Sequence, residues 1–119
     1  MIAMVQIGLH RCFEYSTPID TTVTGPSDYI IVPADMDRTA VQLYVASTAS
    51  VQVEASISTI SQLNDGTAKW LVWDNGPITG NITSQDATKG PVGALRYNVV
   101  GALPGVNGSM SIRCQRGTP

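Results

Sequence analysis

Apolar and polar residues alternate with a period of two along much of the chain, the spacing of a β-strand with one buried face. The first two such runs are 41–46 and 51–58, separated by the four residues 47–50. Their apolar positions are Val41, Leu43, Val45, Val51, Val53, Ala55 and Ile57, and the polar positions between them include Gln42, Tyr44, Gln52, Glu54 and Ser56. The short separation predicts two strands joined by a tight hairpin.

A second pair of alternating runs lies near the end of the chain. Its apolar positions are Leu95, Tyr97, Val99, Met110, Ile112 and Cys114, and the positions between them are polar up to Gln115. The stretch Gly101 to Gly108 is rich in turn residues, so the pattern predicts a second hairpin. Alternation sets Arg96 on the side opposite Leu95 and Tyr97. We expect solvent or an acidic partner beside Arg96, a core ion pair being the costlier alternative.

Shorter strands are predicted at Val5 to Glu14, Tyr29 to Val32 and Lys69 to Trp73, with a weaker one at Asn81 to Ser84. The only candidate for a turn of helix is Ala34 to Thr39, with Asp35 as its N-cap. The chain contains 12 valines and 22 serines and threonines, which suit half-buried pleated surfaces. The pattern therefore predicts an all-β protein, an antiparallel β-sandwich or jelly roll of seven or eight short strands. A closed barrel is the second choice.

Composition narrows the classes of function. The 119 residues are 43% hydrophobic and only 13% charged, with a net charge of -2. This favours one folded domain over residues 1–119 and disfavours disorder. Seven scattered basic residues offer no stripe for nucleic acid and no anchor for a membrane surface. With no secretion signal at the start and no long apolar span, we expect synthesis in a cytoplasm, and no membrane partner.

Cys12 and Cys114 are then expected to be reduced. We interpret each as a small buried hydrophobic residue. The alternative is that they mark first and last strands that lie side by side, which would let the two thiols touch.

Residues with catalytic or metal-binding chemistry are sparse. His10 is the only histidine, and no nucleophile motif accompanies it, so a structural or surface role is favoured. Asp35 and Asp37 do not continue into a calcium-loop pattern. The sequons at Asn81 and Asn107 carry weight only in a secreted protein. We predict no catalytic residue, no metal site and no cofactor, and therefore a protein that is not an enzyme.

The segment Lys69 to Asp74 is the most distinctive in the chain, because it holds both tryptophans. Trp70 and Trp73 are three residues apart and fall on opposite faces of a strand. An exposed tryptophan can anchor an oligomer or stack on a sugar. The alternative is that loops of the same chain cover both rings.

The N-terminal segment Met1 to Gln6 is too apolar for a free tail. Met1, Ile2 and Met4 are its large apolar residues, and we expect the segment to pair with or pack onto a neighbouring molecule. The predicted loop Thr17 to Asp28 is long for a connection and is a second candidate contact.

The segment Val51 to Gly117 resembles small virion proteins of tailed bacteriophages. The elements that carry the resemblance are Val53-Glu54-Ala55-Ser56, Lys69-Trp70, Gly90 to Val99 and Gly108-Ser109 through Gln115. The resemblance implies a β-sandwich structural protein of the phage particle, such as a capsid decoration or cement protein. Such a protein forms a dimer or trimer on the capsid exterior and binds the major capsid protein.

Together these observations predict partner-binding residues Met1, Ile2, Met4, Trp70, Trp73 and Arg96. The alternatives are a phage tail or fibre component and a carbohydrate-binding sandwich that stacks sugars on Trp70 or Trp73. A small jelly-roll enzyme is the least favoured, because the metal chemistry of such enzymes needs several histidines.

Overall fold

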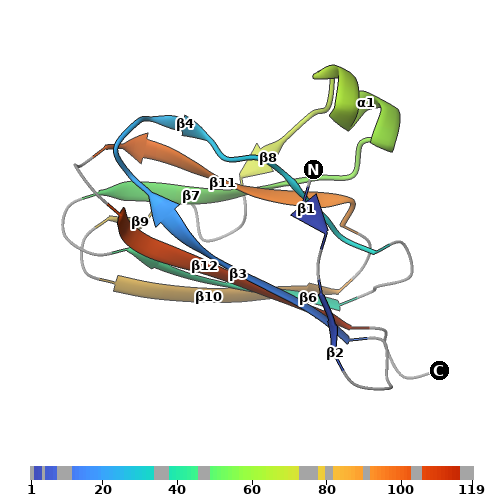
Figure 1. Cartoon of the computed structure of the whole chain (residues 1–119), viewed down its shortest axis with the longest axis horizontal. Coiled ribbons are helices and arrows are strands. Elements are labelled where there is room, and N and C mark those ends of the chain that lie inside the picture. The colour runs from blue at the N-terminus through green and yellow to red at the C-terminus, as the bar shows by residue number, and fades with distance from the viewer. Residues whose placement is uncertain are drawn as a thin grey trace.

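The computed structural model describes residues 2–3, 5–7, 12–33, 38–45, 49–72, 78–79, 82–89, 92–102 and 106–115. Side chains are described in 12–33, 38–45, 49–72, 92–102 and 108–115. These residues fold into two sheets packed face to face, with a short helix at one end of the molecule (Figure 1). The prediction of an all-β antiparallel sandwich is confirmed.

The two sheets are separate, as a sandwich requires and a closed barrel does not. The seven-stranded sheet contains β1 (Ile2–Ala3), β4 (Gly25–Pro26), β5 (Ile30–Ile31), β7 (Ser50–Ser56), β8 (Leu71–Val72), β9 (Ile78–Thr79) and β11 (Ala94–Gly101). The five-stranded sheet contains β10 (Ile82–Lys89), β6 (Arg38–Val45), β12 (Val106–Gln115), β3 (Cys12–Asp20) and β2 (Val5–Ile7), in that order. All pairings are antiparallel except that of β1 with β5. The described strands number twelve rather than seven or eight, because five of them are only two residues long.

The core lies between the two sheets and is built from the alternating positions. The five-stranded sheet contributes Ile19, Val41, Leu43, Val45, Met110, Ile112 and Cys114, and the other sheet contributes Ile30, Val51, Val53, Leu95 and Val99. All of these are at most 5% exposed. The inward positions predicted in 41–45, 51–53, 95–99 and 110–114 are confirmed, with Tyr97 partly buried against the core.

Both predicted hairpins are wrong. β6 and β7 belong to different sheets, and so do β11 and β12. Each connection therefore crosses from one sheet to the other. The physical reason is that alternation identifies the apolar side of a strand but not its neighbour. Two successive strands with the same pattern can lie side by side, or they can face each other across the core, as they do here.

The N-terminal part of the chain also differs from its prediction. Residues Val5 to Glu14 do not form one strand. Instead, β2 pairs antiparallel with β3, with Val5 opposite Glu14 and Ile7 opposite Cys12. β1 belongs to the other sheet, so this short segment contributes a strand to each layer. The predicted loop Thr17 to Asp28 is wrong in part, because residues 17–20 continue β3 and residues 25–26 form β4.

The strands that carry the two cysteines are neighbours, as one hypothesis expected. Cys114 lies opposite Phe13 and Cys12 opposite Gln115, which places the two side chains on opposite faces of the sheet. Neither cysteine is part of a disulfide. Cys114 is buried in the core, and this burial, with a smaller contribution from Cys12, raises the pKa of its thiol to about 11. Cys12 is only partly buried.

One helix was missed, α1 (Ile60–Asp65). Thr59 caps its first turn in a capping box with Gln62, and Gly66 ends it in the left-handed conformation. Six residues are too few to produce an apolar stripe, so only the Thr-x-x-Gln spacing and the glycine signalled it. Of the predicted turn Ala34 to Thr39, residues 34–37 lie outside the described residues and 38–39 begin β6. Within the described part of the chain, no helix is long and apolar enough to cross a membrane.

Candidate functional site

Trp70 and Arg96, predicted separately as partner-binding residues, lie against each other on the outer face of the seven-stranded sheet. The Arg96 guanidinium carbon is 4.1 Å from the centroid of the Trp70 ring. This distance is typical of a cation–π contact, which also shields the flat face of the guanidinium from water. Trp70 comes just before β8 and Arg96 lies on β11, so the contact spans three adjacent strands.

Glu54, on the strand between them, is the acidic partner of Arg96. The two residues are directly opposite in the pairing of β7 with β11. Arg96 Nε donates to Glu54 Oε1 at 2.7 Å. The expectation of an acidic partner outside the core is therefore met within the same chain, and a core ion pair is not formed. We call Trp70, Arg96 and Glu54 the tryptophan–arginine–glutamate stack.

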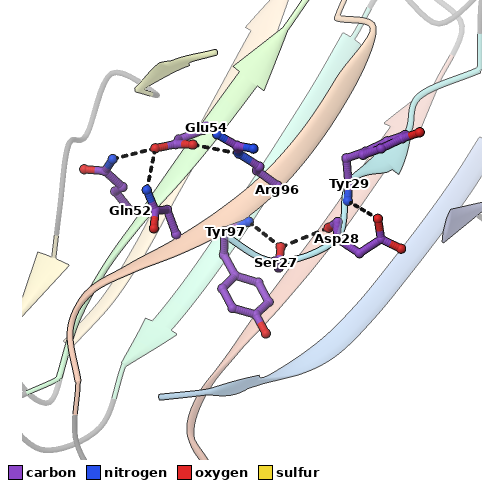
Figure 2. A network of polar contacts seen from close by, with 8 residues as sticks. Ser27, Asp28, Tyr29, Gln52, Glu54, Arg96 and Tyr97 are labelled. Atoms are coloured by element: carbon purple, nitrogen blue, oxygen red, sulfur yellow. Dashed lines mark hydrogen bonds and ion pairs between the residues drawn. The ribbon is translucent and has the colours of Figure 1, made fainter. Parts of the chain in front are cut away.

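Two amides complete the environment of Glu54 (Figure 2). Gln52 Nε2 and Asn98 Nδ2 donate to Glu54 Oε2 at 2.7 and 2.9 Å. Burial alone would raise the pKa of the Glu54 carboxyl. The hydrogen bonds from Asn98, Gln52 and Arg96, with the positive charge of Arg96, outweigh burial and hold that pKa below its ordinary value.

Glu54 is far more buried than its polar position in the pattern indicated. Only 8% of its side chain is exposed, and the paired Arg96 side chain is 22% exposed. The expectation of a solvated polar side was wrong at Glu54, because three donors from two strands surround its carboxylate. It was also wrong at Ser56, which is buried and accepts a hydrogen bond from the amide of Ser58 through Oγ.

Several exposed apolar side chains come from the stretch of chain that leads to and follows Trp70. Seven large hydrophobic side chains are exposed among the described residues, and four of them come from 57–72: Ile57, Ile60, Leu71 and Val72. Ile57 was predicted to be buried, but it lies just beyond the end of β7 and is 81% exposed. We call these four residues the apolar edge.

The remaining predicted partner-binding residues are not brought to the stack by any described contact. Ile2 lies in β1, opposite Ile30 of the same chain. The backbone of residues 2–3 and 5–7 is thus paired within its own chain. Met1, Met4 and Trp73 lie outside the described residues, as do His10, Asp35, Asp37 and Asn81. Asn107 lies within β12. Across the described residues, no group of three or more acidic, histidine or cysteine side chains could hold a metal ion.

On the opposite outer face, that of the five-stranded sheet, polar side chains of β3 and β12 lie in register with each other. Arg113 Nη2 donates to Glu14 Oε2 at 3.2 Å, and the hydroxyls of Ser16 and Ser111 are 3.1 Å apart. Both charged side chains are well exposed. Since Arg113 and Arg96 belong to different sheets, they do not form one basic patch.

Comparison with known proteins gives the fold a context. No protein-family model matches the chain, and no curated protein sequence does. Among solved structures, a chain in the capsid of Ralstonia phage GP4 is similar with a TM-score of 0.52 and 9% identity, covering 94% of this chain and 87% of that one. The SPBc2 prophage-derived protein YomS is similar with a TM-score of 0.50 and 9% identity, covering 92% and 98%. At these identities the likeness is one of fold alone. In both cases it extends over almost the whole sandwich.

Proposed function

We propose that the protein is a structural component of a bacteriophage virion, and more specifically a capsid decoration or cement protein. It would form a dimer or trimer, bind the major capsid protein on the outside of the shell and have no enzymatic activity. The observation that carries the proposal is the similarity of nearly the whole sandwich to a chain of a phage capsid. The resemblance of Val51 to Gly117 to tailed-phage virion proteins supports it independently of the fold. The proposal takes residues 1–119 as one domain.

The described surface suits such a role. A decoration protein stabilises a shell through the free energy of burying interfaces, repeated over many symmetric copies. Tryptophan and arginine are enriched among the residues that dominate interface energies. Trp70 and Arg96 are already ordered against Glu54, so little side-chain entropy remains to be lost when a partner covers them. Leu71 and Val72 of the apolar edge follow Trp70 directly and add exposed apolar surface. Burying that surface against a partner would be favourable.

The proposal is tested by adding the purified protein to shells assembled from the major capsid protein of the phage whose genome encodes it. Binding is measured by co-sedimentation, and shell stability by the temperature of DNA release or shell disassembly. We expect saturable binding and a higher disassembly temperature. Trp70→Ala should weaken binding, and Val23→Ala, at an exposed position outside the stack, should not. No binding to shells, or binding of glycans through Trp70 with shells untouched, would contradict the proposal.

A further inference from the structure

A pocket lies over the middle of the outer face of the five-stranded sheet. It has a volume of about 870 Å³ and is lined by residues of β3, β6 and β12, which are neighbours in the sheet (Figure 1). Small-molecule sites in proteins commonly measure roughly 300–1,000 Å³. The outward-facing residues that line this pocket are Glu14, Ser16, Ala40, Gln42, Ser111 and Arg113.

Short polar side chains form the floor of the pocket. Ser16 lies opposite Ser111, which lies opposite Gln42 on its other side. The hydroxyl oxygens of Ser16 and Ser111 are 3.1 Å apart, so one hydroxyl donates to the other. A serine hydroxyl can donate once and accept twice, and most of the hydrogen-bonding capacity of the pair therefore remains for a ligand. Because Ala40 beside them is also short, a ligand can approach the floor closely.

The charges next to this floor balance each other. Arg113 lies opposite Glu14, and Arg113 Nη2 donates to Glu14 Oε2 at 3.2 Å. Both side chains are well exposed, so each keeps donor or acceptor positions in contact with water. A balanced pair can hydrogen-bond to a ligand but gives no net attraction to a polyanion or a polycation. The pocket therefore favours an uncharged ligand.

An aromatic ring borders the pocket. Tyr44 follows Gln42 on the same face of β6, lies opposite Ser109 of β12 and is 38% exposed. An aromatic side chain can pack against the carbon-bound hydrogens of a sugar ring, while the sugar hydroxyls bond to polar groups nearby. Peptides, by contrast, pair with free strand edges or fill apolar grooves. β6 and β12 each have a partner strand on both sides, so neither offers such an edge.

We propose that this face binds a neutral oligosaccharide. One sugar ring packs on Tyr44, and the next lies over Ser16 and Ser111, within reach of Gln42 and of the pair of Arg113 with Glu14. The inference goes beyond the proposed function and does not depend on it. In a virion, Trp70 and Arg96 on the opposite face would contact the shell, and the bound glycan would lie on the side away from it.

The test is a screen of the full chain on an array of neutral and acidic glycans. Isothermal titration calorimetry then follows with cellotetraose, maltotetraose, mannotetraose and the neutral array glycan that gives the strongest signal. We expect saturable binding of at least one neutral glycan. Ser111→Leu covers the floor with an apolar side chain, and Tyr44→Ala removes the ring. Each should weaken binding about 10-fold.

Ser61→Leu is the matched control, because Ser61 is exposed in α1, outside the pocket. It should bind the glycan as the native chain does. Trp70→Ala should also leave glycan binding unchanged, since Trp70 lies on the other sheet. Thermal unfolding of each variant shows whether it is folded.

Three results would overturn the inference. The first is no binding to any glycan on the array, or binding to acidic glycans alone. The second is glycan binding that neither Ser111→Leu nor Tyr44→Ala weakens. The third is glycan binding that is lost only in Trp70→Ala.

Binding to shells is measured separately with the same variants. Glycan binding by a chain that never binds shells removes the proposed function and leaves the inference. Shell binding by a native chain that binds no glycan does the reverse.

Discussion

The carboxylate of Glu54 lies on the outer face of its sheet but is buried from water. A buried carboxylate needs hydrogen bonds and opposite charge from the groups that surround it. Glu54 has Arg96, Gln52 and Asn98 as donors, all within 2.9 Å. By contrast, Glu14 on the other sheet has the exposed Arg113 at 3.2 Å. The two glutamates thus make the same kind of cross-strand ion pair at different depths, and this difference can be measured.

Glu54→Ala should lower the free energy of unfolding by about 2 kcal/mol, because it leaves three part-buried donors without their acceptor. The matched change Glu14→Ala should cost less than about 1 kcal/mol, as exposed ion pairs contribute little. Chemical denaturation of both variants measures the difference. Equal losses would show that burial of the Glu54 carboxylate does not contribute to stability.

The same carboxylate predicts the acid side of the stability curve. The pKa of Glu54 is lowered in the folded protein, while in the unfolded chain it is near the ordinary value of 4.5. The contribution of Glu54 is therefore fully present above 4.5 and is lost as the pH falls through the lower, folded-state pKa. When denaturation midpoints are measured from neutral to acidic pH, the midpoint of the native chain should decrease as the pH drops below 4.5. The midpoint of Glu54→Gln should decrease less steeply over the same pH range. Asp20 and Asp65, whose pKa values are also lowered by hydrogen bonds from Thr22 and Thr67, remain in both proteins. If the midpoints of the native chain and of Glu54→Gln depended on pH in the same way, the lowered pKa of Glu54 would not contribute to stability.

At the scale of elements, β12 and β6 approach each other closely where Gly108 lies opposite Val45. A Cβ on Gly108 would clash with the backbone carbonyl oxygen of Tyr44. Because that atom belongs to a paired strand, it cannot move aside as a flexible side chain could. β3 flanks the same residue on its other side, where Ile19 is opposite.

Gly108→Ala should therefore lower the free energy of unfolding by about 1–3 kcal/mol, through strain in the five-stranded sheet. Ser109→Ala, one residue along the same strand and partly exposed, should change it by less than about 0.5 kcal/mol. Thermal or chemical unfolding distinguishes the two. A neutral Gly108→Ala would mean that the two strands are farther apart than described.

The elements also show what the sequence could predict. The inward faces of β6, β11 and β12 follow from alternation alone, because the pleat of a strand fixes which side each residue takes. Alternation does not determine which strands pair. For this reason two connections that pass from one sheet to the other were interpreted as hairpins. α1 was missed because six residues leave no helical period.

The candidate site was predictable only in part, for the same reason. Trp70 and Arg96 stood out individually, as a rare aromatic residue and as a charge between two apolar positions. Their contact depends on β8, β7 and β11 being neighbours in the sheet. The order of strands in a sheet cannot be predicted from a local sequence pattern. The burial of Glu54 was missed because hydrogen bonds from β7 and β11 together, and not its own apolar character, remove it from water.

At the scale of the molecule, the two outer faces have different characters. Among the described side chains, the five-stranded sheet presents hydroxyls, the exposed Tyr44 and an exposed ion pair, while the seven-stranded sheet presents the tryptophan–arginine–glutamate stack and Val72 of the apolar edge. Such asymmetry suits a protein that buries one side against partners and leaves the other in water. It agrees with the proposed place of the protein on the outside of a capsid.

The most direct measurement of that place is the number of copies of this chain relative to the major capsid protein, determined by quantitative mass spectrometry of purified phage particles. Sites on an icosahedral shell number on the order of hundreds, while tail positions number on the order of a dozen. A capsid decoration protein should be present in hundreds of copies. About a dozen copies would place it in the tail or fibres, and its absence from the particles would contradict a structural role in the virion.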